Sequence, residues 1–113
     1  MVKIEMVIRP FKLDDVKATL ERLAIQRFTT SNVVDHDGFM VRREIYRGSE
    51  YRIDVPKVKL EAVVSSDRAD EVIEALTLAA RTTIDGDDGA ILIFEVADAV
   101  RVRTGQRLEF ALA

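Results

Sequence analysis

Residues 57–66 read KVKLEAVVSS, and this stretch decides the fold class. Every second side chain from Val58 to Val64 is apolar, and most of the residues between them are charged. Alternation with a period of two is typical of a β-strand that places one face against a core. Ser66 or Asp67 then provides a helix cap, and apolar residues recur at helical spacing from Val72 to Ala80. The stretch predicts a strand followed by an amphipathic helix.

The run that follows, Ala90 to Phe94, is apolar without interruption. An apolar run of strand length predicts a central strand that is covered on both faces. The same order of elements occurs earlier in the chain, with alternation from Val2 to Ile8, helical spacing from Leu13 to Leu23 and many Thr and Val residues from Phe28 to Val34. The chain therefore contains two βαβ units.

Two such units predict a single α+β domain that spans residues 1–113. The most economical arrangement is a ferredoxin-like βαββαβ sandwich, in which both helices cover one face of an antiparallel sheet. Val7, Val63 and the run at residues 91–94 place apolar side chains on the face that the helices leave open. We expect another subunit to bury this face, the alternative being a monomer with scattered apolar surface residues.

Composition excludes several classes of function. The chain has no cysteine, which removes disulfides, thiolate nucleophiles and Cys-ligated metals, and which fits a cytoplasmic protein. Its net charge of -3 argues against a dedicated nucleic-acid binder. No apolar run approaches the roughly 20 residues that span a bilayer, so we expect neither membrane insertion nor an export signal.

Charge is nevertheless uneven along the chain. Six basic and three acidic residues between Arg42 and Lys59 give that segment a local net charge of +3. The composition therefore leaves two alternatives open for this segment, the binding of an anionic small ligand and the binding of an acidic partner surface.

A long interval, Asp35 to Val55, separates the second and third strands without sustained periodicity. An interior loop of this length is unusual unless it has a function, so we interpret it as a recognition arm. Its centre places two aromatic hydroxyls and an arginine around a flexible glycine, and we regard Tyr51 as a candidate for covalent modification. The candidate partner-binding residues of the arm are Tyr46, Arg47, Gly48, Ser49, Glu50 and Tyr51.

This arm resembles that of the PII signal-transduction family, which carries the pattern Y-[KR]-G-[AS]-[AE]-Y. Further matches occur in the right order: RPFKLDDV at 9–16, PKVKLE at 56–61 and RVRTG at 101–105. The resemblance implies the same ferredoxin-like fold and a homotrimer with three protruding arms. It also implies that ATP or ADP binds in clefts between subunits, often with sensing of 2-oxoglutarate through magnesium and ATP. The arm would then dock onto a transporter, an enzyme or a regulator of nitrogen metabolism.

The resemblance also assigns residues to the nucleotide. Arg101 and Arg103 are expected to project from one face of a strand about 7 Å apart, where two guanidinium groups suit neighbouring phosphates, and Lys57 adds a third cation. Isolated basic residues are more often solvated surface charges, but their agreement with family positions favours a role in binding. The candidate nucleotide-binding residues are Thr29, Lys57, Glu61, Val63, Gly86, Gly89, Arg101 and Arg103.

The chain departs from the family in the phosphate loop at residues 82–90. The family ends this loop with a basic residue, where this chain has Ala90. One residue is also inserted in this chain, and the loop carries three carboxylates, at Asp85, Asp87 and Asp88. These carboxylates repel a polyphosphate unless a metal ion intervenes. We therefore expect ADP or AMP to bind at least as well as ATP.

A second departure affects the base of the arm. Phe39 replaces the glutamine that helps family members to hold magnesium, so we expect the response to 2-oxoglutarate to be lost. Residues 35–37 read Asp-His-Asp, but adjacent residues on an extended segment point in different directions, which favours a polar turn over a metal site. We expect neither a metal nor a redox cofactor.

The leading hypothesis is a trimeric regulator that senses adenine nucleotides. Within the family, an adaptor that has lost its ligand response and a role in inorganic-carbon metabolism both remain open. A small ferredoxin-like enzyme is a remote alternative, because no nucleophile or base lies in a recognisable constellation and His36 is the single histidine. An RNA-binding domain of similar fold is disfavoured, since the strands at 2–8 and 57–64 carry no aromatic residue for stacking bases.

Overall fold

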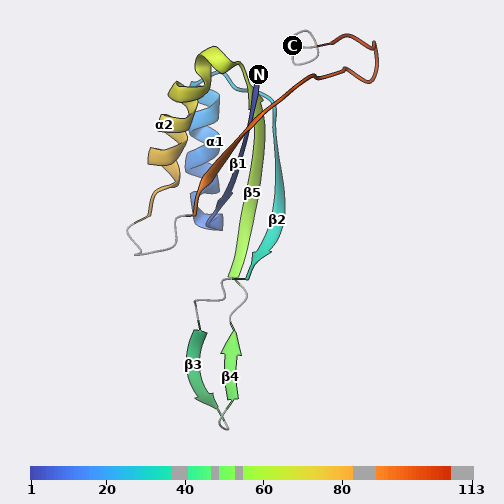
Figure 1. Cartoon of the computed structure of the whole chain (residues 1–113). Coiled ribbons are helices and arrows are strands. Elements are labelled where there is room, and N and C mark those ends of the chain that lie inside the picture. Colours follow the sequence, from blue (N-terminus) through green and yellow to red (C-terminus); the bar gives the residue numbers. More distant parts are fainter. Residues whose placement is uncertain (37–40, 47–48, 53–54, 83–88, 108–113) are drawn as a thin grey trace.

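The computed structural model describes residues 1–36, 41–46, 49–52, 55–82 and 89–107, with backbone alone for 41–46 and 49–52. Figure 1 shows a sheet with both helices on one side of it. The elements in chain order are β1 (Val2–Ile8), the 3₁₀ turn η1 (Pro10–Lys12), α1 (Leu13–Arg22), β2 (Phe28–Asp35), β3 (Val41–Tyr46), β4 (Ser49–Arg52), β5 (Val55–Val64), the 3₁₀ turn η2 (Ser66–Arg68), α2 (Ala69–Ala80) and β6 (Ile91–Glu95).

The main sheet has the strand order β2-β5-β1-β6, and all neighbouring strands are antiparallel. This is the ferredoxin-like arrangement expected from two βαβ units. The prediction of a central strand at Ala90 to Phe94 is wrong, because β6 lies at the edge of the sheet. Its uninterrupted apolar run does not reflect burial on both faces of the sheet within one chain. Leu92, Ile93 and Phe94 are 51%, 53% and 44% exposed.

The core lies between the sheet and the two helices. The even-numbered side chains from Ile4 to Ile8 in β1 and from Val58 to Val64 in β5 are buried, as their alternation predicts. Burying each large aliphatic side chain contributes about 1.5–3 kcal/mol to stability. The buried apolar residues are Ile4, Met6, Ile8, Val16, Leu20, Ile25, Val58, Leu60, Ala62, Val64, Ala69, Val72, Leu76 and Ala80.

Helix α1 has well-defined ends. Asp14 and Asp15 lie in its first turn, where the helix dipole favours negative charge. At its end Ala24 adopts a left-handed conformation with φ of 58°. The amide of Ala24 donates to the carbonyl of Glu21, and the amide of Ile25 donates to that of Leu20. These two bonds form a Schellman motif, which stops the helix before β2.

The predicted cap of the second helix is wrong. Ser66 and Asp67 lie in the turn η2, and α2 starts after Arg68 without a side-chain cap. The hydroxyl of Ser66 instead accepts a hydrogen bond of 2.8 Å from the N-terminal ammonium of Met1. Sequence patterns do not predict where the chain terminus lies. Here its ammonium group binds the hydroxyl that was predicted to cap the helix.

The arm also differs from the expected irregular loop, because β3 and β4 pair within it as an antiparallel hairpin. Tyr46 lies opposite Ser49, and Arg42 lies opposite Tyr51. Figure 1 shows this hairpin beyond the ends of β2 and β5. Backbone pairing does not require an apolar stripe, which is why hydrophobic periodicity did not indicate these strands.

Candidate functional site

A hollow of about 440 Å³ brings together three of the residues that the family resemblance assigns to the nucleotide. Thr29 lies directly opposite Glu61 in the pairing of β2 with β5, and Val63 lies two residues further along β5. The residues that line this hollow, which we call the β2–β5 hollow, are Lys3, Gln26, Arg27, Phe28, Thr29, Glu61, Ala62 and Val63.

Sequence reasoning missed part of this lining. Lys3 pairs opposite Val63 across β1 and β5, so strand register was the signal that would have found it. Gln26 and Arg27 immediately precede β2, and no sequence pattern assigned them to a site. Together with Glu61 they give the hollow two cations, one carboxylate and one amide.

Four charged side chains on the open face form a closed set next to this hollow. In this charge quartet, defined as Lys3, Glu5, Lys59 and Glu61, positive and negative groups alternate. The Lys59 ammonium lies 3.1 Å from Glu61 and 3.2 Å from Glu5. The Lys3 ammonium lies 3.6 Å from Glu5 and 3.7 Å from Glu61. Each charge therefore contacts two opposite charges.

The quartet changes the acid–base behaviour of two members. The hydrogen bond from Lys59 lowers the pKa of Glu61 below its ordinary value. Desolvation opposes this hydrogen bond with a smaller effect, and the positive charge of Lys3 adds to the lowering. Hydrogen bonds to Glu61 and Glu5 raise the pKa of Lys59 above its ordinary value. Both groups stay charged at neutral pH, so Glu61 enters the β2–β5 hollow as a carboxylate.

Apolar side chains flank the quartet on the same face. Leu92 pairs opposite Glu5, and Phe94 pairs opposite Lys3. The Lys3 ammonium lies 5.7 Å from the centre of the Phe94 ring, within the range of a cation–π contact. The open face of the sheet thus carries a satisfied charge cluster beside exposed apolar residues of β6.

Lys57 does not lie in the β2–β5 hollow. Its side chain is 2% exposed, and its ammonium lies 3.5 Å from a carboxylate oxygen of Asp35 at the end of β2. The sequence predicted a cation that meets a phosphate, whereas in this structure Lys57 is a buried ion-pair partner.

Arg101 and Arg103 are also not in this hollow, and the prediction that they project from a strand is wrong. Residues 102–104 form a turn, in which the amide of Gly105 donates to the carbonyl of Arg101 at 2.8 Å. A bridge between Val100 and Arg107 closes this C-terminal hairpin. Figure 1 shows the segment after β6 leaving the sheet on the side away from the helices.

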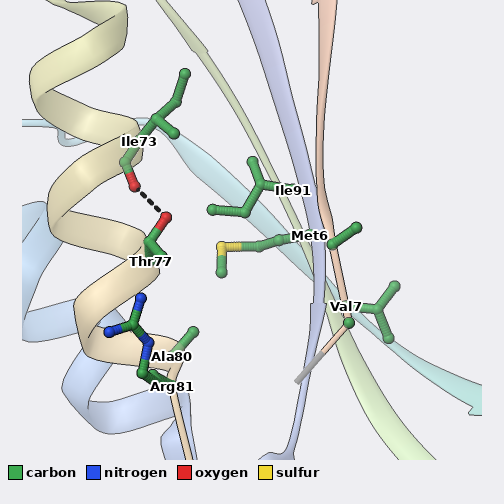
Figure 2. A pocket seen from close by; sticks show the side chains of 9 residues that line it. Met6, Val7, Ile73, Thr77, Ala80, Arg81 and Ile91 are labelled. Carbon is green, nitrogen blue, oxygen red and sulfur yellow. Dashed lines mark hydrogen bonds between the residues drawn. The ribbon is translucent and has the colours of Figure 1, made fainter. Parts of the chain in front are cut away.

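A second hollow, of about 300 Å³, lies between α2 and the edge of the sheet (Figure 2). Met6 and Ile91 point into it from the strands, whereas Val7 points to the opposite face. Gly89 lines this hollow with φ of +72°, and an added Cβ would lie 3.2 Å from the carbonyl oxygen of Val7. Only glycine adopts this conformation at low cost. Gly86, the other predicted phosphate-loop glycine, lies outside the described residues.

The structure describes the backbone of four of the six candidate partner-binding residues. Tyr46 ends β3, and Ser49, Glu50 and Tyr51 lie in β4. Arg47 and Gly48 lie outside the described residues.

Within the described part of the chain, no three His, Cys, Asp or Glu side chains are grouped as a metal site. Of the Asp-His-Asp sequence at 35–37, Asp37 is outside that part. A search of the same residues finds no helix with the length and apolar character needed to cross a bilayer.

Comparison with known proteins agrees with this geometry. A family model described as nitrogen regulatory protein P-II matches residues 1–106. The nitrogen regulatory protein P-II of Pasteurella multocida is 42% identical over 113 residues, which cover 99% of this chain and 100% of the relative. The protein of the same description from Haemophilus influenzae is 43% identical with the same coverage. Nitrogen regulatory protein P-II 1 of Escherichia coli (strain K12) is 40% identical, again over 99% and 100% of the two chains.

A family match over almost the whole chain, relatives at about 40% identity over nearly full length, and the ferredoxin-like strand order all agree. The chain belongs to the nitrogen regulatory protein P-II family of signal-transduction regulators.

Proposed function

We propose that this chain forms a homotrimer, senses an adenine nucleotide in clefts between subunits, and controls a partner protein through its arm. The observation that carries the proposal is the β2–β5 hollow, where Thr29, Glu61 and Val63 lie together at an edge of the sheet. A purine nucleotide needs an apolar wall for its base and polar groups for its ribose, and Val63 and Glu61 supply one of each.

The open face of the sheet supports the homotrimer. Its apolar members Leu92 and Phe94 are 51% and 44% exposed in one chain, and they lie beside the charge quartet. A contiguous surface of this kind is typical of a subunit interface. Copies of the same chain are the occupants that family membership favours.

The location of the arginines supports a cleft that two subunits complete. Arg101 and Arg103 lie on the C-terminal hairpin and do not line the β2–β5 hollow of their own chain. Val100 and Val102 of the same hairpin are 52% and 100% exposed. In the proposed trimer this hairpin contacts a neighbouring subunit, which covers both valines and brings the guanidinium groups to the phosphates of a nucleotide in that subunit's hollow.

The proposed ligand is ADP or AMP in preference to ATP. Ala90 supplies no charge where the family holds a further phosphate, and Phe39 supplies no ligand for magnesium. A hydrogen bond to a charged group is worth about 1.5–3 kcal/mol, so the loss of one contact weakens ATP by about tenfold or more. We infer for the same reason that 2-oxoglutarate adds nothing to binding.

The partner is a transporter, an enzyme or a transcriptional regulator of nitrogen or inorganic-carbon metabolism, and we infer that the protein works in the cytoplasm. The paired strands β3 and β4 support the arm as the docking element, since they extend Tyr46 and Tyr51 beyond the sheet. An adaptor that has lost its nucleotide response is the alternative within the family.

Calorimetric titration of the full chain with ATP, ADP and AMP, each with and without 2-oxoglutarate and magnesium, tests the proposal. We expect ADP or AMP to bind at least as tightly as ATP, and Arg103→Ala to weaken binding by about tenfold or more. Arg107→Ala is the matched control, because Arg107 lies on the same hairpin and pairs with Asp98 at 2.9 Å. Tight ATP binding that 2-oxoglutarate strengthens would contradict the proposal, and no binding of any nucleotide would favour the adaptor.

A further inference from the structure

The outer surface of the two helices contains a groove that is separate from the β2–β5 hollow. Figure 1 shows α1 and α2 side by side on one face of the sheet. The guanidinium of Arg68 donates a hydrogen bond of 2.6 Å to the carbonyl of Leu23, which holds the end of α1 against the start of α2. The groove between the helices, which we call the helix groove, has a volume of about 500 Å³. Helix α1 lines it with Thr19 and Arg22, and α2 lines it with outward-facing residues between Glu71 and Ala79.

One end of the helix groove is apolar. From Ala75 to Ala80 helix α2 contains no charged residue, although the outer surface of a helix is normally polar. Ala75 and Ala79 line the groove there, together with Leu78, which is 63% exposed. The small alanine side chains leave room beside Leu78, so this end can receive an apolar side chain of a partner.

The other end of the helix groove is acidic. Glu71 lies 3.8 Å from the guanidinium of Arg68, and Glu74 has no ion-pair partner in the described part of the chain. Both glutamates are exposed, and they outnumber Arg22, the one cation of the lining. Together α1 and α2 carry six carboxylates and two cations, a net charge of -4, whereas the whole chain has a net charge of -3. A field of this sign attracts and orients a basic partner.

Helical geometry fixes the distance between the two ends. Glu74 precedes Leu78 by four residues and Glu71 precedes it by seven, which are about 6 Å and about 10 Å along the axis. The three side chains therefore lie along one side of α2. A second helix that packs along the groove presents its own side chains at the same intervals. An apolar anchor against Leu78 then places basic residues, one and two turns away, against Glu74 and Glu71.

We propose that the helix groove docks an amphipathic helix of a partner protein. This helix carries an apolar anchor for Leu78, and Lys or Arg one and two turns from that anchor. The proposal adds a second partner surface to the arm, and it does not depend on nucleotide binding. In the trimer proposed above, the interface lies on the opposite face of the sheet and leaves the helix groove accessible.

Fluorescence anisotropy with a labelled peptide tests this docking. The probe contains Leu, Ala and Lys over about 18 residues, long enough to form a helix in water, with lysines four and seven residues from each leucine. A peptide of the same composition, with Leu and Lys spread evenly around the helix, is the control. We expect the full-length wild-type chain to bind the patterned peptide about tenfold or more tightly than the control peptide.

Two variants locate the binding in the groove. Glu74→Lys replaces an attraction with a repulsion, and Leu78→Ala removes the apolar contact, so we expect each to weaken binding of the patterned peptide by about tenfold. Glu21→Lys is the matched control, because Glu21 is an exposed glutamate of α1 outside the lining, and its replacement changes the net charge by the same amount. Its affinity should stay within about twofold of wild type.

Three outcomes would overturn the proposal. They are no binding of the patterned peptide, equal affinity for the two peptides, and an equal effect of Glu21→Lys and Glu74→Lys, which would mean that long-range charge alone attracts the peptide. Concentration-dependent self-association of wild type that Leu78→Ala removes would assign the groove to a second copy of this chain, which also overturns the proposal. The peptide titration needs no nucleotide, so failure to bind ADP would overturn the proposed function and leave this result unaffected.

Discussion

Glu61 serves two structures at once, since it is a member of the charge quartet and also lines the β2–β5 hollow. Its contacts with Lys59 and Lys3 orient the carboxylate before a ligand arrives. A positioned carboxylate loses little freedom when it binds a hydroxyl group, which favours recognition of a ribose. The same contacts make the stability of the fold depend on the charge of Glu61.

This dependence predicts a pH effect with a definite sign. Because the pKa of Glu61 is lowered in the folded state, its contribution is complete above the ordinary glutamate pKa of about 4.3 and is lost as the pH falls through the lower folded value. We expect Glu61→Gln to melt below wild type at pH 7, and the gap to narrow as the pH falls below about 4. Thermal midpoints measured from pH 7 to pH 2.5 check this.

Glu74→Gln is the control for this measurement, because Glu74 is an exposed glutamate of α2. Its midpoint should stay close to that of wild type throughout. If the difference in thermal midpoint between Glu61→Gln and wild type did not change with pH, the charge quartet would not stabilise the fold through the carboxylate of Glu61.

At the scale of elements, sequence patterns were most successful where one face is buried. Alternation in β1 and β5 and helical spacing in α1 and α2 have a core on one side, and the structure confirms all four. β6 and the arm were harder to predict. The apolar run of β6 indicates cover on both faces, which its own chain does not supply, so its place in the sheet could not be inferred. The hairpin of β3 and β4 pairs by backbone groups, which leave no apolar period.

The sequence likewise predicted only part of the candidate site. Thr29, Glu61 and Val63 lie together because strand register fixes them, and a matching motif implied them. Lys57, Arg101 and Arg103 were harder, because their positions depend on an ion pair and on a hairpin that no sequence pattern encodes.

The end of α1 gives a test of element stability. Ala24 occupies a left-handed conformation, with φ of 58°, that costs a residue with a Cβ about 1–2 kcal/mol. We expect Ala24→Gly to raise the free energy of unfolding by about 0.5–1 kcal/mol. The gain from removing the unfavourable left-handed conformation is partly offset, because glycine has a larger backbone conformational entropy in the unfolded chain. Urea denaturation measures the change.

Ala18→Gly is the matched control, since Ala18 is an exposed residue in the middle of the same helix. It should lower the free energy of unfolding by about 1 kcal/mol. The same sign of effect in both variants would show that the left-handed position does not govern this helix end.

At the scale of the whole molecule, three features of the single chain are those expected of a subunit in a larger assembly. The edge strand β6 is half exposed, the C-terminal hairpin carries exposed valines, and the cations of the proposed site lie apart from the β2–β5 hollow. The proposed trimer accounts for all three features together, because in it each chain both receives and supplies an interface.

Light scattering coupled to size exclusion tests this assembly. Three chains of 12.7 kDa give about 38 kDa, and we expect that mass at micromolar concentration. Phe94→Asp places a charge on the open face and should yield a smaller species. Leu78→Asp, which alters a 63% exposed residue on α2, should remain a trimer.

The central claim is that each nucleotide cleft takes Glu61 from one subunit and Arg103 from its neighbour. It is tested most directly by mixing two variants, Glu61→Ala and Arg103→Ala, that each fail to bind ADP as homotrimers. Random reassembly gives about a quarter of the clefts both intact residues, so the mixed trimers should recover about that fraction of wild-type ADP sites in a calorimetric titration. Recovery of no sites after verified subunit exchange would contradict the account, because it would mean that both residues act within a single chain.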